Sequence, residues 1–516
     1  MKANGARLAL ETAYSAGVEV CFANPGTTEM DLVSALDDVP GIRSVLCLFE
    51  GVATGAADGY GRIAGKPALT LLHLGPGFAN GIANLHNARR AATPIVNLIG
   101  DHAQWHVAAD APLTSDIESL ARPVSHFVQR PESPEQLARS MADAIGASVG
   151  PPSGVASLIV PQDVAWDEVD AEIPRVAAAT DAAVDRAAID AAASELLART
   201  GEAGLLLGGV LDERCLESAA RIQEKTGCRV WLDTFLPRLR EGRGVPAFDA
   251  LPYFPEQAIE ALSGLQTLVT AGTRPPVAFF GYRNIGRSRL EPESCRSQAI
   301  SAAATPPGPA LEALAEAVGA EPLKLQETAP LPGLTDGPLD VASLGLALAH
   351  WLPADAILVN EAATSGLGWG LYGRSAAPHD TLSLTGGAIG QGIPNAVGAA
   401  IAAPDQRVVA LQADGSGMYT VQGLWTLARE NLDVTVVVCA NRAYRILQAE
   451  LGRSGQGEPG PVALGLTQLT SPSLDWLCLA EGMGIPGCRV ERVDELAAAL
   501  ERRSGAAGPF LIEALL

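Results

Sequence analysis

Residues 408–447 read VVALQADGSGMYTVQGLWTLARENLDVTVVVCANRAYRIL, and they are the most informative part of the chain. Apolar runs over 408–412 and 434–439 predict two buried strands. Apolar residues at helical spacing over 420–430 predict one helix between them. A right-handed strand–helix–strand unit places the carboxyl ends of both strands at the same edge of a parallel sheet, where ligands bind.

Asp414 and Asn441 follow these two strands, so we expect a carboxylate and a carboxamide at that edge. Oxygen ligands of this kind suit Mg²⁺, which takes one or two protein groups together with phosphate oxygens and water. A turn aspartate and a capping asparagine would give the same pattern, because both residue types are common in turns. The residues alone therefore define a candidate metal–diphosphate site.

The pattern resembles the thiamine-diphosphate motif of the 2-oxo-acid decarboxylase and acetolactate synthase superfamily. The resemblance implies that Asp414, Asn441 and the carbonyl oxygen of Ala443 hold Mg²⁺. Two positions depart from the common form, because Ala413 replaces a glycine and Ala440 replaces a second asparagine. If position 413 required a positive φ, alanine would cost on the order of 1 kcal/mol there.

The resemblance implies further cofactor contacts in the last third of the chain. A strand predicted over 357–360 ends just before a hydroxyl group that can reach the diphosphate. The glycine-rich turn over 384–400 suits close approach of the backbone to an anion, and Ile389 matches the large apolar residue that the family places beneath the cofactor. The implied contact positions are Thr364, Gly387, Ile389, Gly415 and Ser416.

A second element lies near the N-terminus, where residues 45–49 predict a strand that ends at Glu50. By itself this glutamate is typical of an ordinary helix start, which the helix dipole favours. With the stretch ADGYGR that follows, however, it resembles the pyrimidine-binding domain of the same enzymes. There the glutamate hydrogen-bonds the aminopyrimidine ring and promotes ylid formation, best as the neutral carboxyl that the apolar neighbours Leu48, Phe49 and Val52 favour.

Two histidines are candidates for handling protons on the substrate. His73 ends a predicted strand at the place where benzoylformate decarboxylase-like enzymes have an active-site histidine, and His102 ends the next strand. Either can instead be a structural histidine bonded to nearby backbone. Residues 20–24 predict another strand, and the PGTTE sequence after it is expected to open a helix with a threonine cap. The loop positions implied to line the pocket are Asn24, Thr27 and Asn80.

Composition limits the classes of partner. The net charge of −22 argues against nucleic acid and anionic membranes. No segment of about 18 uninterrupted apolar residues is present, and the N-terminus lacks a signal-peptide pattern. The eight cysteines are scattered without a CxxC pair, which is typical of a reduced cytoplasmic protein and implies no zinc site.

The 516 residues suit about three domains. Alternating short strands and helices predict an α/β protein with three doubly wound parallel sheets. The expected domains are pyrimidine-binding (1–170), middle (189–322) and diphosphate-binding (339–516), with linker composition over 165–188 and 324–338. The resemblance implies that the first and third share a fold. A dinucleotide-binding dehydrogenase is excluded, because NPGTTE follows the first strand in place of GxGxxG.

The resemblance implies attack of the ylid on a 2-oxo acid or related carbonyl substrate, with loss of CO₂. Carboligation follows in acetolactate synthase, whereas benzoylformate decarboxylase-like enzymes release an aldehyde; a C–C lyase is a further alternative. FAD is not expected, because the middle domain is small. Phe279, Phe280 and Tyr282 match a substrate-wall loop and can select an apolar substrate, or they can be domain core.

The resemblance also implies a homodimer or homotetramer with active sites at subunit interfaces, because Glu50 would reach the cofactor of a neighbouring subunit. The alternative of another class is a catalytically idle family member with an assembly role. The intact Glu50, Asp414 and Asn441 argue against it.

Overall fold

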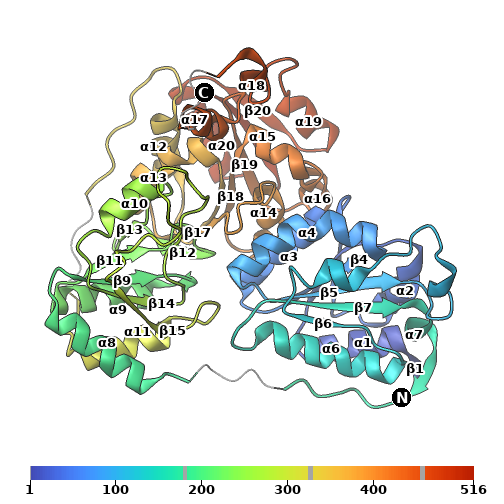
Figure 1. Ribbon diagram of the computed structural model, residues 1–516. Coiled ribbons are helices and arrows are strands. Elements are labelled where there is room, and N and C mark those ends of the chain that lie inside the picture. Colours follow the sequence, from blue (N-terminus) through green and yellow to red (C-terminus); the bar gives the residue numbers. More distant parts are fainter. Residues whose placement is uncertain (1, 178–182, 324–328, 454–458) are drawn as a thin grey trace. The chain divides into compact units, whose positions relative to one another are not determined.

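The structure forms two compact units, each built on parallel sheet (Figure 1). This computed structural model describes residues 2–177, 183–323, 329–453 and 459–516. The first unit comprises residues 1–149, 154–178 and 330–516, and the second comprises residues 150–153 and 179–329. Parts of both predicted linkers, 178–182 and 324–328, lie outside the described residues.

The N-terminal part of the first unit contains a parallel six-stranded sheet with the order β3-β2-β4-β5-β7-β6. The order reverses between β2 and β4, so their carboxyl ends form a topological switch point. The strands are β2 (Val20–Asn24), β3 (Arg43–Leu46), β4 (Ala68–Leu72), β5 (Ile95–Asp101), β6 (Phe127–Gln129) and β7 (Val155–Pro161).

The predicted strand over 45–49 is wrong in its bounds. Pairing with β2 stops at Leu46, and Phe49 is already the N-cap of the next helix. The apolar run predicted a longer strand than the structure contains. β3 is an edge strand that pairs only with β2, so its backbone can turn toward the helix after Leu46.

The C-terminal part of the same unit contains six parallel strands in the order β17-β16-β18-β19-β21-β20. Counted along the chain, this order is identical to that of the N-terminal sheet, so the two parts share a fold without an obvious sequence repeat. Here the switch point lies between β16 and β18. The strands are β16 (Ile357–Glu361), β17 (His379–Ser383), β18 (Val408–Ala413), β19 (Val434–Ala440), β20 (Gly487–Val490) and β21 (Phe510–Leu515).

The second unit has a parallel five-stranded sheet with the order β13-β11-β9-β14-β15. Phe279 and Phe280 are 40% and 53% exposed, so they are not part of its core. The strands are β9 (Ala203–Leu207), β11 (Arg229–Leu232), β13 (Asp249–Ala250), β14 (Thr267–Ala271) and β15 (Arg296–Ser301). The predicted α/β class with three parallel sheets is therefore confirmed.

Helices connect most successive strands of each sheet, as is usual for parallel pairing. The connections from β11 to β13 and from β14 to β15, whose residues are all described, contain no helix. None of the described helices combines the length and apolar character needed to cross a membrane. The helices of the first unit are α1 (Gly5–Ser15), α2 (Met30–Asp38), α3 (Glu50–Ala64), α4 (Leu74–Ala91), α5 (Ile117–Ala121), α6 (Pro134–Val149), α7 (Gln162–Trp166), α12 (Val341–Trp351), α13 (Leu367–Tyr372), α14 (Gly392–Ala402), α15 (Asp414–Gly417), α16 (Gly423–Arg429), α17 (Arg445–Arg453), α18 (Pro461–Gly465), α19 (Trp476–Gly482) and α20 (Val493–Ser504). Those of the second unit are α8 (Arg186–Ala198), α9 (Glu213–Thr226), α10 (Pro255–Ala261) and α11 (Gly308–Ala317).

Helices α3 and α14 join the two sheets of the first unit. A Cβ atom on Gly398 of α14 would lie 1.8 Å from the carbonyl oxygen of Ala56 of α3. A Cβ on Gly59 of α3 would lie 2.1 Å from the carbonyl oxygen of Asn395. Only hydrogen atoms fit between these backbones, and apolar residues of both sheets form one continuous core around the contact.

We expect Gly398→Ala to lower the thermal unfolding midpoint, because the added methyl group overpacks the α3–α14 contact at a cost of about 1–3 kcal/mol. Gly146→Ala is the matched control, since a Cβ there meets no atom within 4 Å in helix α6. The control should be neutral or stabilising, because alanine is the better helix former. Equal midpoints for the two variants would contradict the close packing.

Candidate functional site

The predicted site residues gather at the two switch points of the first unit. Asp414 follows β18 and Thr364 follows β16, at the C-terminal switch point. His73 follows β4 and Asn24 ends β2, at the N-terminal one. This is where open parallel sheets bind ligands, because loops from the two strands diverge there.

Asp414 is held rigidly at the start of α15. Its Oδ1 accepts a hydrogen bond from the Gly415 backbone N–H at 2.8 Å, and its Oδ2 accepts one from the Arg442 N–H at 2.7 Å. The side chain is buried, and this burial raises the pKa of the carboxyl, opposed by the two backbone bonds. A metal-free Asp414 therefore holds a proton more readily than an exposed aspartate.

The loop after β19 brings the other two predicted ligands beside Asp414. The Ala443 N–H donates to Asn441 Oδ1 at 3.0 Å, and Asn441 Nδ2 lies 3.4 Å from Ser365 Oγ. Between them Arg442 has φ +55°, a left-handed conformation that is costly for a side-chain-bearing residue. The carboxylate, carboxamide and carbonyl oxygens thus come from two adjacent strand ends.

This donor set fits Mg²⁺ rather than a transition metal. Within the described part of the chain, no three His, Cys, Asp or Glu side chains cluster in a way that could hold a metal ion. One carboxylate, one amide and one backbone carbonyl leave positions for phosphate oxygens and water, as Mg²⁺ prefers. The residues present therefore fit a cation that is bound together with a diphosphate.

The alanine at position 413, where the common form of the motif has glycine, causes no backbone strain. Ala413 has φ −76° and ψ 145°, an extended conformation that alanine adopts freely. Glycine is favoured two positions later, because a Cβ on Gly415 would lie 2.5 Å from the ring of Tyr444.

The polar residues predicted for the diphosphate differ in their surroundings. Thr364 is half-buried in a 3₁₀ turn (Ala363–Gly366) and follows Ala363, whose φ is +48°. Ser416 is buried, and its Oγ accepts a bond from Gln412 Nε2 at 2.6 Å and lies 3.2 Å from the Ala413 carbonyl oxygen. Its hydroxyl is already engaged by protein groups, so its phosphate contact stays a prediction.

The predicted glycine turn adopts the backbone conformations that only glycine accepts easily. Gly387 has φ +76° and Gly390 has φ +98°. Ile389 lies between them and is half-buried, and the carbonyl of Gly390 accepts a bond from Thr420 Oγ1 at 2.8 Å.

Glu50 is the first residue of α3 and is 7% exposed. Asn80 Nδ2 donates to its Oε2 at 3.0 Å, which joins two of the predicted site residues. Asn84 Nδ2 then links this helix to the glycine turn, because it donates to the Gly51 carbonyl at 2.8 Å and to the Gly390 carbonyl at 3.2 Å. Glu50 and the turn that carries Ile389 are thus connected within one chain.

His73 has a partner that the sequence analysis missed. Its Nδ1 lies 2.8 Å from Oε2 of Glu29, which is fully buried and also accepts the Gly26 N–H at 2.7 Å. The expected threonine cap is therefore wrong, since the Glu29 carboxylate takes that role. A glutamate three residues after the start of the turn is the capping-box spacing, and this signal was present in the sequence. Leu74, next to His73, has φ +48°.

His102 lies at the end of the strand next to that of His73. Its backbone N–H donates to Asp101 Oδ1 at 2.8 Å, and Asp101 forms an ion pair with Arg130. Burial raises the pKa of Asp101, while Arg130 opposes this. Among the described residues, His102 Nε2 is buried without a hydrogen-bond partner. Thr27 is exposed at the start of the 3₁₀ helix Thr27–Glu29.

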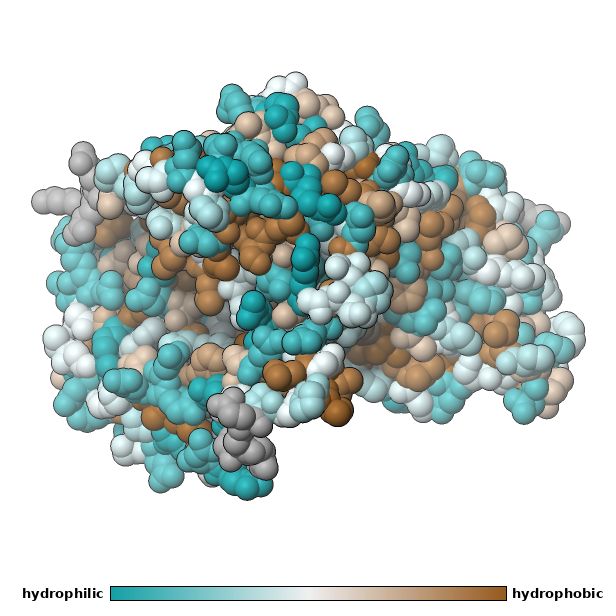
Figure 2. All heavy atoms as spheres, turned by 90° about the horizontal axis from the view of Figure 1, so that it is seen from above, coloured by the Kyte–Doolittle hydropathy of each residue, from teal (hydrophilic) through white to brown (hydrophobic). Residues whose placement is uncertain are grey.

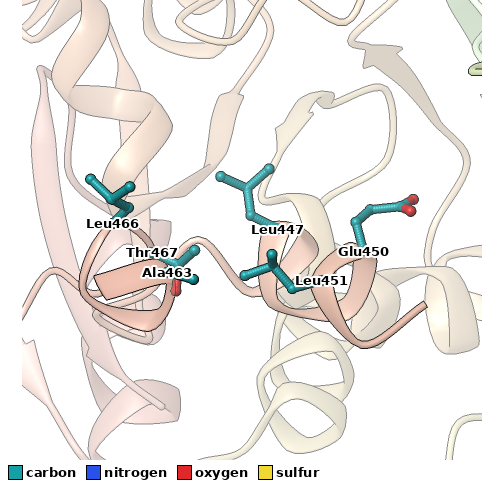
Figure 3. A pocket seen from close by; sticks show the side chains of 6 residues that line it. All are labelled: Leu447, Glu450, Leu451, Ala463, Leu466 and Thr467. Atoms are coloured by element: carbon teal, nitrogen blue, oxygen red, sulfur yellow. The ribbon is translucent and has the colours of Figure 1, made fainter. Parts of the chain in front are cut away.

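An apolar pocket of about 410 Å³ adjoins the loop that carries Asn441 and Ala443 (Figure 3). Helix α17 forms one wall and α18 with the residues after it forms the other, and the Glu450 carboxylate extends away from the opposite wall. The Tyr444 N–H donates to the Thr467 carbonyl at 2.8 Å, which ties both walls together. The lining residues are Leu447, Glu450, Leu451, Ala463, Leu466 and Thr467.

Comparisons with known proteins agree with this geometry. Two family models match: thiamine pyrophosphate enzyme, N-terminal TPP binding domain (residues 3–120), and thiamine pyrophosphate enzyme, C-terminal TPP binding domain (residues 365–514). The chain is 46% identical over 521 residues to the "Putative acetolactate synthase large subunit IlvX" of Mycobacterium tuberculosis, with 99% of each covered. It is 27% identical to benzoylformate decarboxylase of Pseudomonas aeruginosa, with 96% of each covered.

Among solved structures, the chain is similar to a thiamine diphosphate-dependent 4-hydroxybenzoylformate decarboxylase of Rhodococcus jostii. The TM-score is 0.84 at 26% sequence identity, and the match covers 99% of this chain and 98% of that one.

We expect Mg²⁺-dependent binding of thiamine diphosphate to weaken as the pH falls, beginning above the ordinary range of an aspartate. The cation requires the Asp414 carboxylate, whereas burial raises the pKa of this group. The same pKa shift affects the stability of the metal-free protein in the opposite direction. The protonated Asp414 favours the folded state at low pH, and this contribution to the free energy of unfolding is lost as the pH rises from the unfolded-state pKa through the raised folded-state pKa.

Thermal unfolding across pH, with and without Mg²⁺ and thiamine diphosphate, measures both effects. At a hundredfold excess over Kd the ligands should add about 2.7 kcal/mol of stability. Asp414→Asn should abolish this gain, whereas Asp405→Asn, at an exposed position in the turn before β18, should keep it. A full ligand-induced shift in Asp414→Asn would contradict the assignment.

Proposed function

Because this chain belongs to the thiamine pyrophosphate enzyme family, in the branch of the acetolactate synthases and benzoylformate decarboxylases, we propose that it decarboxylates a small 2-oxo acid with thiamine diphosphate and Mg²⁺ and then ligates the product to a second carbonyl. The observation that carries the proposal is the arrangement of three elements in one unit. The Asp414–Asn441–Ala443 oxygens lie at one switch point, the glycine turn at the same sheet edge, and Glu50 is linked to that turn through Asn84.

The chain's residues have distinct tasks in this proposal. When bound, thiamine diphosphate supplies a nucleophilic carbon and an electron sink for the carbon that loses CO₂. Asp414, Asn441 and Ala443 would hold the cation, and through it the diphosphate. Ile389 would support the cofactor from below, and Glu50 would hold a proton against its aminopyrimidine ring.

The His73–Glu29 pair is suited to move a proton at the substrate's carbonyl oxygen. The Glu29 carboxylate orients the imidazole through Nδ1, so Nε2 is left for the substrate. Histidine exchanges protons near neutral pH, which suits a step that must both donate and accept. His102 on the neighbouring strand is the second candidate for this task.

Apolar surroundings support a substrate with an apolar side chain. Leu447, Leu451 and Leu466 line the pocket beside the loop that would hold the cation. Release of a free aldehyde is the alternative outcome, and the similarity to decarboxylases of aromatic 2-oxo acids favours it. FAD is not part of the proposal.

We further propose a cytoplasmic homodimer or homotetramer. The eight cysteines are all free thiols, which suits a reducing compartment. Apolar patches lie among hydrophilic residues on the face seen in Figure 2, and Leu367, Leu371, Val462 and Leu466 are large exposed apolar side chains of the C-terminal part. Exchange of the α3–α14 contact between two copies would keep the same local geometry and place active sites at the subunit interface.

Turnover on a panel of 2-oxo acids tests the proposal. Pyruvate, 2-oxobutyrate, a branched-chain 2-oxo acid and benzoylformate are supplied with thiamine diphosphate and Mg²⁺ present or withheld, and CO₂ and organic products are followed together. Cofactor-dependent CO₂ release with an acyloin or acetohydroxy acid is the expected result. Free aldehyde in place of the ligated product would identify a decarboxylase, and a protein that binds no cofactor would overturn the proposal.

We expect Glu50→Gln to reduce turnover by about 10²- to 10⁴-fold, the usual contribution of a positioned acid–base group, with cofactor affinity nearly unchanged. Glu213→Gln is the control, because Glu213 is also the first residue of a helix but is exposed in the second unit. Steady-state kinetics and cofactor titration measure the two effects. A Glu50→Gln protein that turns over substrate at the parent rate would refute the assignment.

A further inference from the structure

Glu361 is a buried carboxylate to which the proposed chemistry assigns no task. It ends strand β16 and is 4% exposed. Its Oε1 accepts the Gly390 N–H at 2.6 Å, and its Oε2 accepts the Gly392 N–H at 2.5 Å. Burial raises the pKa of this group, and the backbone bonds oppose the rise. Both carboxylate oxygens are therefore committed to the backbone of the glycine turn.

These two N–H groups lie just after Ile389, and the rest of the turn is held equally firmly. The Gly390 carbonyl accepts bonds from Thr420 Oγ1 and Asn84 Nδ2. Both polar backbone groups of Gly390 are thus fixed while it keeps φ +98°. If Ile389 moved from its present position, the hydrogen bonds from the Gly390 and Gly392 N–H groups to the Glu361 carboxylate would break. Such charge-assisted hydrogen bonds are stronger than neutral ones.

Gln412 extends the clamp to the turn that carries Asp414. Its Nε2 donates to Glu361 Oε2 at 3.1 Å and to Ser416 Oγ at 2.6 Å. A Cβ on Gly392 would lie 2.2 Å from Gln412 Oε1, so a larger residue at that position would displace the Gln412 amide. The glycine turn and the turn after β18 are therefore joined by one short hydrogen-bond network across the switch point.

We propose that Glu361 is a positioning residue. Its carboxylate clamps the Gly390 and Gly392 N–H groups and so fixes the position of Ile389 relative to the turn that carries Asp414. The inference rests on the proposed function, because it gives the clamp the task of presenting Ile389 to the cofactor. Glu361 acts through the turn, because its two side-chain oxygens accept the N–H groups of Gly390 and Gly392. Loss of the clamp therefore impairs activation of the cofactor more than its anchoring.

Two variants test this role. Glu361→Gln keeps the shape but places an amide N–H₂ against a backbone N–H, whereas Glu361→Asp keeps the charge and shortens the side chain. Glu513→Gln is the control, because Glu513 is also a buried carboxylate of this sheet and accepts a bond from Arg489 instead of from the glycine turn.

Three readouts are measured on each folded protein with Mg²⁺. One is the Kd for inorganic pyrophosphate, which reports only how well the protein and Mg²⁺ bind the diphosphate part of the cofactor. Another is the rate at which bound thiamine diphosphate exchanges the proton of its reactive carbon for solvent deuterium, which needs no substrate. The last is the thermal unfolding midpoint.

We expect Glu361→Gln to slow the exchange at least about tenfold, because small displacements of a reacting group are costly, while the pyrophosphate Kd changes less than about threefold. Glu361→Asp should slow it by a smaller factor, which keeps the test available if Glu361→Gln does not fold. Glu513→Gln should leave the exchange rate unchanged even if its unfolding midpoint falls.

Parent-like exchange in both Glu361 variants would overturn the inference alone. A fall in exchange that Glu513→Gln reproduces would also overturn it, since the role would then be merely structural. If the parent protein itself binds no thiamine diphosphate, the proposed function fails, and this inference fails with it.

Discussion

The buried ion pair between Asp58 and Arg62 is the interaction on which the first unit depends. Arg62 Nε and Nη2 donate to the two Asp58 oxygens at 2.8 and 2.6 Å, a paired geometry that suits guanidinium and carboxylate. Arg62 also donates to the Ser383 carbonyl at 2.7 Å and to Gln391 Oε1 at 3.3 Å, so it spans from the helix of Glu50 to the glycine turn. Removing one partner of such a buried pair costs about 3–5 kcal/mol, because the other charge is left uncompensated.

Three of the eight described non-glycine residues with positive φ lie just after strands that carry predicted site residues. Leu74, Ala363 and Arg442 all have positive φ, and they adjoin His73, Thr364 and Asn441 respectively. Each such conformation costs about 1–3 kcal/mol and persists only where surrounding bonds impose it. The bond from the Arg442 N–H to Asp414 is one of them. At the C-terminal switch point, this bond holds the loop after β19 against Asp414.

Much of this site could be predicted from residue order. Asp414 and Asn441 are candidates because apolar strands end just before them, whereas Glu50 by itself is typical of a helix start and becomes a candidate only through the resemblance. Glu29 and Glu361 were missed as partners, although Glu29 has capping-box spacing. Their hydrogen bonds reach residues 44 and 29–31 positions away, and local periodicity carries no information on such pairs.

The sequence by itself determined the fold class and which types of residue follow the strands, because hydrophobic periodicity and turn residues act over a few positions. The tertiary structure alone decided which carboxylates are buried, which backbone groups they hold, and that Ala413 needs no positive φ. It also decided that α3 lies against α14, where Gly59 and Gly398 leave room for the two backbones. The physical reason is that burial and hydrogen-bond partners are set by packing between segments far apart in the chain.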